Sequence, residues 1–209
     1  MSRDAAFAPA SGVGARQIWI IRHAQTEWSV NGRHTGRTDI PLTPSGVAAA
    51  EALKPWIQSV TFDRVLSSPL SRAIETARLC GLGGQVQVEP LLMEWDYGAY
   101  EGVTTHQIQE RVPDWDLWRH GCPGGESLEQ VATRARDLLR SIAATPGGVA
   151  LFTHGHFARL IIAAWLQLPA SRGRSFAIRA GSVTVLGLEH GNPVIWAAGD
   201  VPGTPGVGR

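Results

Sequence analysis

Ile18–Trp28 reads IWIIRHAQTEW, an apolar run that ends abruptly at an arginine and a histidine. A continuous apolar run of this kind is typical of a strand that is buried on both faces of a sheet. In open α/β sheets, ligands bind beyond the carboxyl ends of such strands. Arg22 and His23 stand at that position. The stretch therefore predicts an α/β fold with two polar side chains at a ligand-binding edge.

The same order of elements, an apolar strand, polar residues and then a helix, recurs twice along the chain. A strand over 62–67 leads to Ser68 and Arg72, and a strand over 149–153 leads to His154. Helical side chains lean toward the N-terminus, so Arg72 should point back at the strand end. If the strands are parallel neighbours, we expect all three polar groups to converge on one cavity.

Local signals predict where several helices begin and end. Thr43 and the proline after it indicate a helix that Pro55 kinks or ends. Ser68, also followed by proline, is expected to cap the helix that carries Arg72. A capping box at Ser127 begins a long amphipathic helix up to about residue 142. Further strands are expected at 17–21, 85–88, 183–188 and 194–196, with a turn at 191–193 before the last of them. A polar loop at 31–39 is expected to wrap over the site, and residues 104–125 are expected to form an irregular excursion.

Composition indicates one globular domain. The chain has 209 residues, of which 44% are hydrophobic and 18% charged, enough to bury a substantial core. We expect a single domain over 16–198. It would lie between a flexible Ala/Gly/Ser-rich segment at 1–15 and a flexible Gly/Pro-rich tail at 199–209.

Charge and cysteine content bear on partners and location. The net charge of +1 comes from 19 basic and 18 acidic residues spread along the chain, which does not favour nucleic acid. Neither a secretion signal nor a membrane-spanning apolar run is evident. Cys80 and Cys122 provide no disulfide framework. We expect a cytoplasmic protein with reduced thiols and with neither nucleic acid nor membrane as a partner; the sequence leaves a homodimer open.

The predicted cavity suits a phosphoryl group. Arg22 and Arg72 supply planar donors for phosphate oxygens, helix N-termini add N–H groups, and a histidine can act as nucleophile. The arginine charges are expected to lower the pKa of His23 below the ordinary value of about 6.5, so that its imidazole stays neutral in mild acid. Phosphoryl transfer needs positioning and charge neutralisation above all, which fixed cations provide without a metal or other cofactor.

A leaving alkoxide also needs a proton. Glu94 is a candidate donor, because the negative charge of a bound phosphate would favour its protonated form. Asp96 and Glu101 are rivals that the residues alone do not rank. His154 and His156 lack a third ligand nearby, so we interpret His154 as catalytic and His156 as structural or at the rim.

The other histidines, arginines and tryptophans receive weaker assignments. We expect His34, His106, His120 and His190 on the surface or in hydrogen bonds. Arg33, Arg37, Arg111 and Arg119 are expected in solvent or against a second acidic group of a substrate. Most tryptophans are expected in the core, with Trp95, Trp115 and Trp118 as candidates for the cavity entrance.

Taken together, these residues resemble the R-H-G-E-T-x-W signature of the histidine phosphatase superfamily, which includes cofactor-dependent phosphoglycerate mutases and acid phosphatases. Ala24, Gln25 and Ser29 depart from the usual Gly, Glu and Asn, but none of these changes removes a reacting group. The family fold is a three-layer α/β/α sandwich with a mostly parallel central sheet, in agreement with the alternation above. The resemblance covers 22–28, 35–36, 39–43, 67–69 with Arg72, 94–98, 125–127 and 154–156.

The resemblance implies a role for each matched residue. His23 would become phosphorylated, Glu94 would act as acid and then base, and three residues would bind the phosphoryl group: Arg22, Arg72 and His154. The implied substrate contacts are Thr26, Ser29, Thr35, Gly36, Tyr97 and Gly155.

The leading functional hypothesis is a metal-independent phosphomonoesterase with a phosphohistidine intermediate. Segments 25–29, 94–98 and 118–122 are most similar to the branch that holds fungal sedoheptulose bisphosphatase and bacterial acid phosphatases, which favours small sugar phosphates or bisphosphates. A phosphoglycerate mutase is the nearest alternative, although family mutases have a longer insertion before the second histidine. A non-catalytic module that binds phosphorylated ligands is disfavoured by the intact reacting residues.

Overall fold

The computed structural model describes residues 17–201, so the predicted flexible segment 1–15 and residues 202–209 lie outside the described range. The described strands form one mixed sheet, in which four neighbouring strands are parallel, the fifth pairs with them in antiparallel fashion and the sixth is antiparallel to the fifth. The predicted α/β class with a mostly parallel sheet is confirmed. In sheet order the strands are β3 (Val86–Val88), β2 (Arg64–Ser67), β4 (Val149–Thr153), β1 (Ile18–Arg22), β5 (Val183–Glu189) and β6 (Asn192–Asp200).

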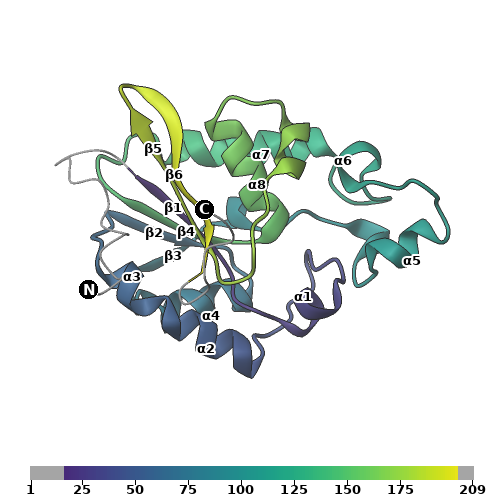
Figure 1. Cartoon of the computed structure of the whole chain (residues 1–209), viewed down its shortest axis with the longest axis horizontal. Helices are drawn as coiled ribbons and strands as arrows, with labels where there is room; N and C mark the ends of the chain where they lie inside the picture. Colours follow the sequence, from purple (N-terminus) through teal and green to yellow (C-terminus); the bar gives the residue numbers. More distant parts are fainter. Residues whose placement is uncertain (1–16, 202–209) are drawn as a thin grey trace, which may run out of the picture.

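Helices cover both faces of the sheet and form the predicted three layers (Figure 1). On one face lie α2 (Pro44–Ala52), α3 (Lys54–Gln58) and α4 (Ser71–Leu79), and on the other lie α7 (Leu128–Ser141) and α8 (Gly155–Trp165). Within the described range, none of the helices combines the length and apolar character that crossing a membrane requires. The remaining helices are α1 (Glu27–Asn31), α5 (Thr105–Gln109), α6 (Leu117–His120) and the 3₁₀ turns 83–85, 90–92, 98–100 and 170–175.

The continuous apolar run of β1 is explained by two cores, one on each face of the sheet. Ile18 and Ile20 pack with α7 and α8, whereas Trp19 and Ile21 pack with α3 and α4. All four side chains are at most 2% exposed. Because successive strand residues point to opposite faces, a strand between two helical layers must be apolar at every position.

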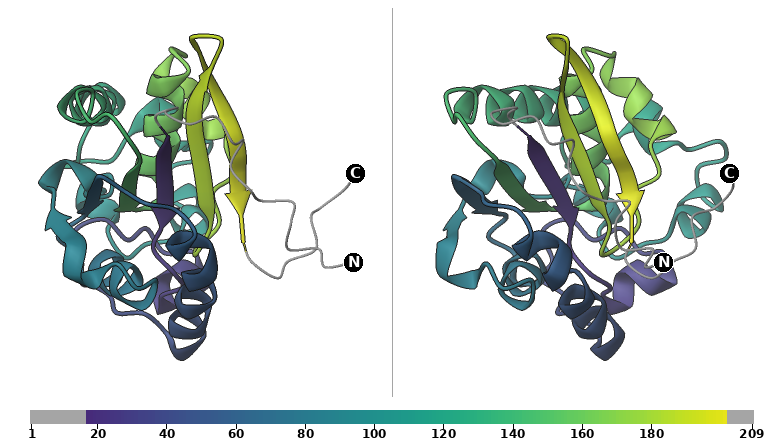
Figure 2. Two further views of the ribbon diagram at one scale, coloured as in Figure 1. Left: turned by 90° about the vertical axis from the view of Figure 1, so that its left-hand side faces the viewer. Right: turned by 60° about the vertical axis from the view of Figure 1, so that its left-hand side comes forward.

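The C-terminal hairpin of β5 and β6 extends the sheet along one edge (Figure 2). Its turn lies at His190 and Gly191, whose φ angles of 50° and 82° suit a two-residue hairpin loop. The turn is therefore one residue earlier than predicted. β6 also continues through Gly199 and Asp200, two residues beyond the predicted domain end, because pairing with β5 orders them.

The predicted cap at Ser68 is wrong. α4 begins at Ser71, and its preceding residue makes no side-chain cap. The carboxylate of Asp39, from the distant polar loop, accepts the Ser71 N–H at 2.9 Å. An acceptor from another segment thus replaces the local cap, and Ser68 is left available for a contact in the site described below.

The other predicted helix signals are confirmed. Thr43 Oγ1 accepts the N–H of Gly46 at 3.0 Å and caps α2, which ends at Ala52, shortly before Pro55. Ser127 forms the predicted capping box of α7.

Gly46 packs directly against the segment that follows His23. A Cβ at Gly46 would lie 2.2 Å from the carbonyl oxygen of Gln25, which also accepts the Thr43 N–H at 2.9 Å. Alanine usually stabilises a helix over glycine by about 1 kcal/mol, but here Gly46→Ala should lower the free energy of unfolding. Urea denaturation measures it, with Gly84→Ala as a control because a Cβ there meets nothing within 4 Å. A Gly46→Ala protein as stable as wild type would contradict this contact.

Candidate active site

The sheet order brings the three predicted polar groups to one edge. β4 lies between β1 and β2, with Arg22 opposite Thr153 and Ser67 opposite Phe152. All three strands are parallel, so the residues that follow them emerge on the same side. The backbone N–H of His23 then donates to the Thr153 carbonyl at 2.8 Å. The three groups therefore meet at one edge of the sheet, as predicted, although Arg72 and His154 do not line the cavity described below.

His23 is buried and held in one orientation. Its Nδ1 lies 2.8 Å from the carbonyl oxygen of Ala24, an acceptor, so Nδ1 carries the proton and Nε2 of the neutral ring has a free lone pair. Burial, followed by the charges of Arg22 and Arg72, holds the pKa of His23 well below its ordinary value. The imidazole is therefore a neutral base or nucleophile in mildly acidic solution, as predicted.

His154 lies next to His23, with ring centroids 5.1 Å apart. Its Nδ1 accepts from Arg72 Nε at 3.2 Å, so its Nε2 carries the proton and donates to Ser68 Oγ at 2.8 Å. Burial and the Arg72 charge hold the pKa of His154 well below its usual range. Both ring nitrogens are thus used in fixing the imidazole beside His23.

Arg72 ties the polar loop to the sheet. Its guanidinium is completely buried and donates to the backbone carbonyls of Thr38 at 2.9 Å, Thr35 at 3.1 Å and Gly36 at 3.0 Å. The loop therefore folds over this edge, as predicted. Burial lowers the pKa of Arg72, and the negative charge of Glu94 is the largest of the effects that raise it.

Glu94 is the carboxylate that the structure selects from the three candidates. Its Oε1 accepts the N–H groups of Trp95 at 2.9 Å and Phe157 at 2.8 Å, and its Oε2 accepts that of His156 at 3.0 Å. Two of these donors belong to the first turn of α8, where the helix dipole favours negative charge. Asp96 and Glu101 bind other loop groups instead and do not line the cavity.

A cavity of about 190 Å³ opens at this edge. Three of the five predicted catalytic residues line it, whereas Arg72 and His154 stand behind its wall. Of the six predicted substrate contacts, four line it. The complete lining is Arg22, His23, Trp28, Ser29, Gly32, Arg33, His34, Thr35, Glu94, Tyr97, Thr105, Gly155, His156 and Arg159.

Thr26 and Gly36, the other two predicted contacts, shape the backbone around the cavity. Thr26 Oγ1 accepts the Ser29 N–H, and Ser29 Oγ accepts the Thr26 N–H in return, which caps α1. A Cβ at Gly36 would lie 2.6 Å from the Trp95 carbonyl oxygen and 2.7 Å from a Glu101 carboxylate oxygen. Only glycine permits this close approach.

Gly155 serves the cavity in the same way. A Cβ at Gly155 would lie 3.1 Å from Cζ of Arg22 and 3.2 Å from its Nε. The guanidinium therefore packs on the bare helix backbone, while its Nη1 donates to the Ile178 carbonyl at 2.6 Å. Arg22 Nε is buried without a hydrogen-bond partner among the described residues.

Arg159 is a cavity residue that sequence reasoning missed. It follows Gly155 by four positions on α8, and this helical spacing is the signal that places both on one face. His156 lines the cavity, with Nδ1 2.7 Å from the Tyr97 hydroxyl. His34 makes a hydrogen bond, as predicted, because its Nδ1–H donates to the Val103 carbonyl at 2.7 Å, but it also lines the cavity.

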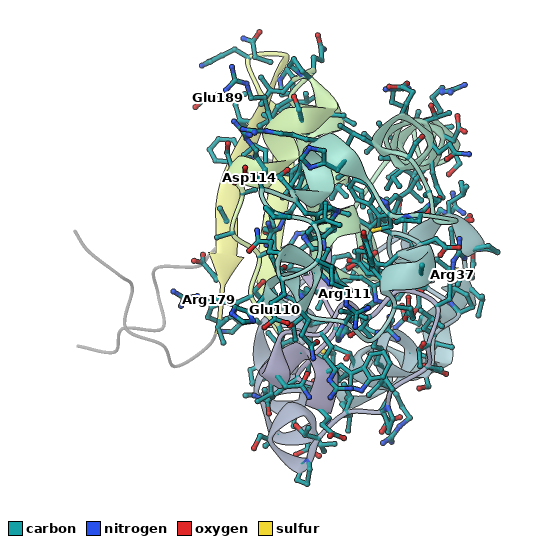
Figure 3. The ribbon with its side chains drawn as sticks, turned by 90° about the vertical axis from the view of Figure 1, so that its right-hand side faces the viewer. Arg37, Glu110, Arg111, Asp114, Arg179 and Glu189 are labelled. Atoms are coloured by element: carbon teal, nitrogen blue, oxygen red, sulfur yellow. The ribbon has the colours of Figure 1, made fainter. Side chains whose placement is uncertain are left out.

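Of the four arginines that the sequence places in solvent or against a second acidic group, only Arg33 lines the cavity. Arg33 lines it, whereas Arg37, Arg111 and Arg119 are exposed and lie outside its wall. Figure 3 shows Arg37 and Arg111 on the face of the molecule that carries α5. The prediction that these arginines are solvated therefore holds for the three outside the cavity.

The expectation that Trp95, Trp115 and Trp118 line the entrance is wrong. All three are at most 8% exposed and belong to the core between the sheet and α7 and α8. Trp95 packs edge-on against Trp118 with centroids 5.6 Å apart. Trp115 donates from Nε1 to the Gly121 carbonyl at 2.9 Å. The tryptophans of the 104–125 excursion therefore join the main core on this face of the sheet.

Arg134, on α7, holds the segment that carries Glu94. It donates to the backbone carbonyls of Met93 and Glu94, and it forms two hydrogen bonds to the Glu126 carboxylate, at 3.0 and 2.7 Å. Its guanidinium also lies 4.2 Å from the ring centroid of Phe157, whose N–H binds Glu94. Arg134 therefore connects α7, the Glu94 segment and the start of α8.

A cavity of about 190 Å³ with arginines in its wall, and a neutral histidine just beyond the carboxyl end of a parallel strand, form the kind of site that phosphoryl transfer requires. The chain belongs to the histidine phosphatase superfamily (branch 1), which matches it over residues 18–200. It is a phosphatase, and the predicted family is confirmed.

Its relatives include proteins of the predicted branch. The acid phosphatase of Mycobacterium tuberculosis is 43% identical over 185 residues, which are 86% of this chain and 90% of the relative. Sedoheptulose 1,7-bisphosphatase of Saccharomyces cerevisiae is 33% identical over 184 residues, with coverage of 71% and 67%. The solved structure of an open reading frame from Mycobacterium tuberculosis superimposes with a TM-score of 0.85 at 41% identity, covering 89% of this chain and 98% of that one.

The buried histidines should make stability depend on pH. The pKa values of His23 and His154 are near 6.5 in the unfolded chain and well below it in the fold. Between the two values only the unfolded chain binds these protons. The free energy of unfolding should therefore fall as the pH drops below about 6.5, by up to about 1.4 kcal/mol per pH unit for each histidine. Urea denaturation from pH 7.5 to 5 measures this slope.

Two variants test whether the buried histidines cause this dependence of stability on pH. His154→Gln removes one of the two titrating groups, so the slope should become shallower by up to about 1.4 kcal/mol per pH unit. His106→Gln replaces an exposed side chain on α5 and should leave the slope unchanged. A slope unaltered by His154→Gln would contradict the neutral, buried state of this ring.

Arg134→Met should destabilise the protein by about 3 kcal/mol, because the largely buried carboxylate of Glu126 loses its shortest ion pair and keeps only the Asp96 N–H and the more distant Arg37. It should also lower kcat, since the Glu94 segment loses its anchor. The matched control is Arg136→Met on the same helix, which removes an exposed ion pair with Glu129 and should cost at most about 1 kcal/mol. Equal losses of stability in the two variants would refute the anchoring role.

Proposed function

We propose that this phosphatase hydrolyses small phosphomonoesters without a metal ion, through a phosphohistidine at His23. The observation that carries the proposal is the state of His23: buried, neutral, with Nδ1–H held by a backbone carbonyl and Nε2 left as the nucleophilic atom. Arg22 stands in the same cavity with a buried N–H that has no partner among the described residues. Glu94 supplies the carboxyl group.

In the first step, His23 Nε2 attacks phosphorus. An N–P bond forms as the bond between phosphorus and the ester oxygen breaks, and Glu94, in its protonated form, gives its proton to the departing alkoxide. Arg22 donates to the phosphoryl oxygens. The positive charge of Arg72, which acts on His23, also favours the negative charge on those oxygens, and His154 packs against the His23 ring, with centroids 5.1 Å apart, and helps to hold it in place.

In the second step, water replaces the alcohol. The Glu94 carboxylate removes a proton from water, whose oxygen attacks phosphorus. The N–P bond breaks, inorganic phosphate is released, and His23 returns to its neutral form with Nδ1 still bound to the Ala24 carbonyl. A mutase would instead return the phosphoryl group to a sugar-acid hydroxyl, and the short chain between Glu94 and His154 supports hydrolysis.

The substrates proposed are small phosphorylated metabolites, in particular sugar phosphates or bisphosphates. A cavity of about 190 Å³ is below the roughly 300–1,000 Å³ of pockets for drug-sized ligands. The relatives named acid phosphatase and sedoheptulose 1,7-bisphosphatase support substrates of this kind.

Replacement of the nucleophile tests the mechanism. Wild-type protein should hydrolyse p-nitrophenyl phosphate in the presence of a chelator, and His23→Ala should reduce kcat by about 10³-fold or more, because no phosphoenzyme can form. Rapid acid-free quenching with labelled substrate should trap a base-stable phosphoramidate on the wild type alone. His106→Ala is the control for a histidine outside the cavity. Activity that survives in His23→Ala, or that a chelator removes and a metal restores, would refute the proposal.

A further inference from the structure

Glu101 is a half-buried carboxylate that does not line the cavity and that forms no ion pair within residues 17–201. Its Oε1 accepts instead the backbone N–H of Gly36 at 2.8 Å and that of Thr38 at 3.1 Å. Its Oε2 lies so close to Gly36 that a Cβ there would be 2.7 Å away. Because hydrogen bonds to a carboxylate are stronger than those between neutral groups, Glu101 fixes the bend of the polar loop at 36–38.

The same bend binds Arg72 through its carbonyl groups. The peptide group that joins Thr35 and Gly36 is bound at both ends: its N–H donates to Glu101, and its carbonyl oxygen accepts from Arg72 Nη2 at 3.1 Å. The carbonyl oxygens of Gly36 and Thr38 accept from Arg72 as well, at 3.0 and 2.9 Å. Since the N–H and C=O of a trans peptide point in opposite directions, the loop lies between the carboxylate and the guanidinium.

The orientation of Arg72 depends on this loop. Among the described residues, its Nη1 and Nη2 donate hydrogen bonds to loop carbonyls alone, whereas its Nε donates to His154 Nδ1 at 3.2 Å. A guanidinium is planar and rigid, so the bonds at Nη1 and Nη2 also set the direction of Nε–H. The His154 ring in turn packs against that of His23, with centroids 5.1 Å apart. A continuous series of contacts therefore leads from Glu101 to His23.

The other anchors of the loop do not hold the bend in this way. Two backbone hydrogen bonds, of 2.8 and 3.0 Å, join His34 to residues 102–103, and they fix the part of the loop that lines the cavity. At the bend itself, Arg37 pairs with Asp96 at 3.4 Å, but its side chain is 43% exposed. Loss of the Glu101 carboxylate should therefore release the bend and leave the cavity-lining part of the loop in place.

We propose that Glu101 is a positioning residue of this phosphatase, which fixes the bend at 36–38 and thereby holds Arg72 and His154 in the arrangement that orients His23. The inference rests on the proposed function, because it takes His23 as the nucleophile. Glu101 touches neither the cavity nor the reacting atoms. Its contribution therefore concerns the alignment of the nucleophile, which determines kcat, more than the binding of substrate, which determines KM.

Three variants test this role with p-nitrophenyl phosphate as the substrate. Glu101→Ala removes the acceptor of both N–H groups, whereas Glu101→Gln keeps a carbonyl oxygen that can accept them. Glu110→Ala is the matched control, because it removes an exposed carboxylate of α5 whose partner is His106. Urea denaturation of each variant establishes that the kinetics are measured on folded protein.

Glu101→Ala should lower kcat by about ten- to a hundredfold and change KM by less than about threefold, because a misplaced nucleophile is costly while the cavity wall is retained. Glu101→Gln should keep kcat within about threefold of the wild type, since it restores the hydrogen bonds without the charge. Glu110→Ala should be indistinguishable from the wild type. A residue that merely stabilised the fold would leave kcat of the folded enzyme unchanged.

A second readout follows Arg72 itself and does not depend on turnover. The buried Nε–H of Arg72, which is bound to His154, should give a slowly exchanging signal in the ¹H–¹⁵N spectrum of the substrate-free protein, identified by its loss in Arg72→Lys. Glu101→Ala should shift this signal and speed its exchange with water, whereas Glu101→Gln and Glu110→Ala should preserve it.

The inference is overturned if kcat of Glu101→Ala lies within about threefold of the wild type, if the Arg72 signal is unchanged in that variant, or if Glu101→Gln is as impaired as Glu101→Ala. The proposed function fails by a different result, namely activity that survives in His23→Ala. In that case the Arg72 signal still decides whether Glu101 holds the guanidinium. If activity requires His23 but Glu101→Ala retains kcat, only the role of Glu101 is wrong.

Discussion

Three guanidinium groups that are partly or fully buried, those of Arg22, Arg72 and Arg159, lie in the electrostatic field of one carboxylate, Glu94. Burial lowers the pKa of each arginine, and in each case Glu94 is the first charge that opposes this effect. The carboxylate can stand among them because the first turn of α8 binds it through backbone N–H groups. Charge that would be costly to bury alone is tolerated through this arrangement.

The same arrangement explains why the histidines are neutral. Burial disfavours the charged form of both rings, and an imidazolium would also add like charge next to Arg22 and Arg72, so the pKa values of His23 and His154 fall. Hydrogen bonds then decide which nitrogen keeps the proton: the Ala24 carbonyl for His23, and Arg72 for His154. Electrostatics sets the protonation state, and local hydrogen bonding sets the orientation of the lone pairs.

Long-range contacts assign several residues to roles that their neighbours in sequence do not indicate. Asp39 caps α4 in place of Ser68, and Ser68 accepts a hydrogen bond from His154 Nε2 instead. Arg134 brings α7 to the segment of Glu94. In each case, a polar group that a local pattern left ambiguous is satisfied by a partner more than 30 residues away. Buried polar groups need hydrogen-bond partners, and the fold provides them from any segment that packs close enough, however far away it lies in the sequence.

The sequence by itself determined the alternation of strands and helices, most caps, and the catalytic candidates at the ends of β1, β2 and β4, because periodicity, capping and chain direction are local properties. Only the tertiary structure decided that Glu94 lines the cavity while Asp96 does not, that the excursion tryptophans form a core, and that Arg159 enters the cavity wall. Each of these outcomes depends on which distant segments pack together, and the packing of distant segments is not encoded in the spacing of nearby residues.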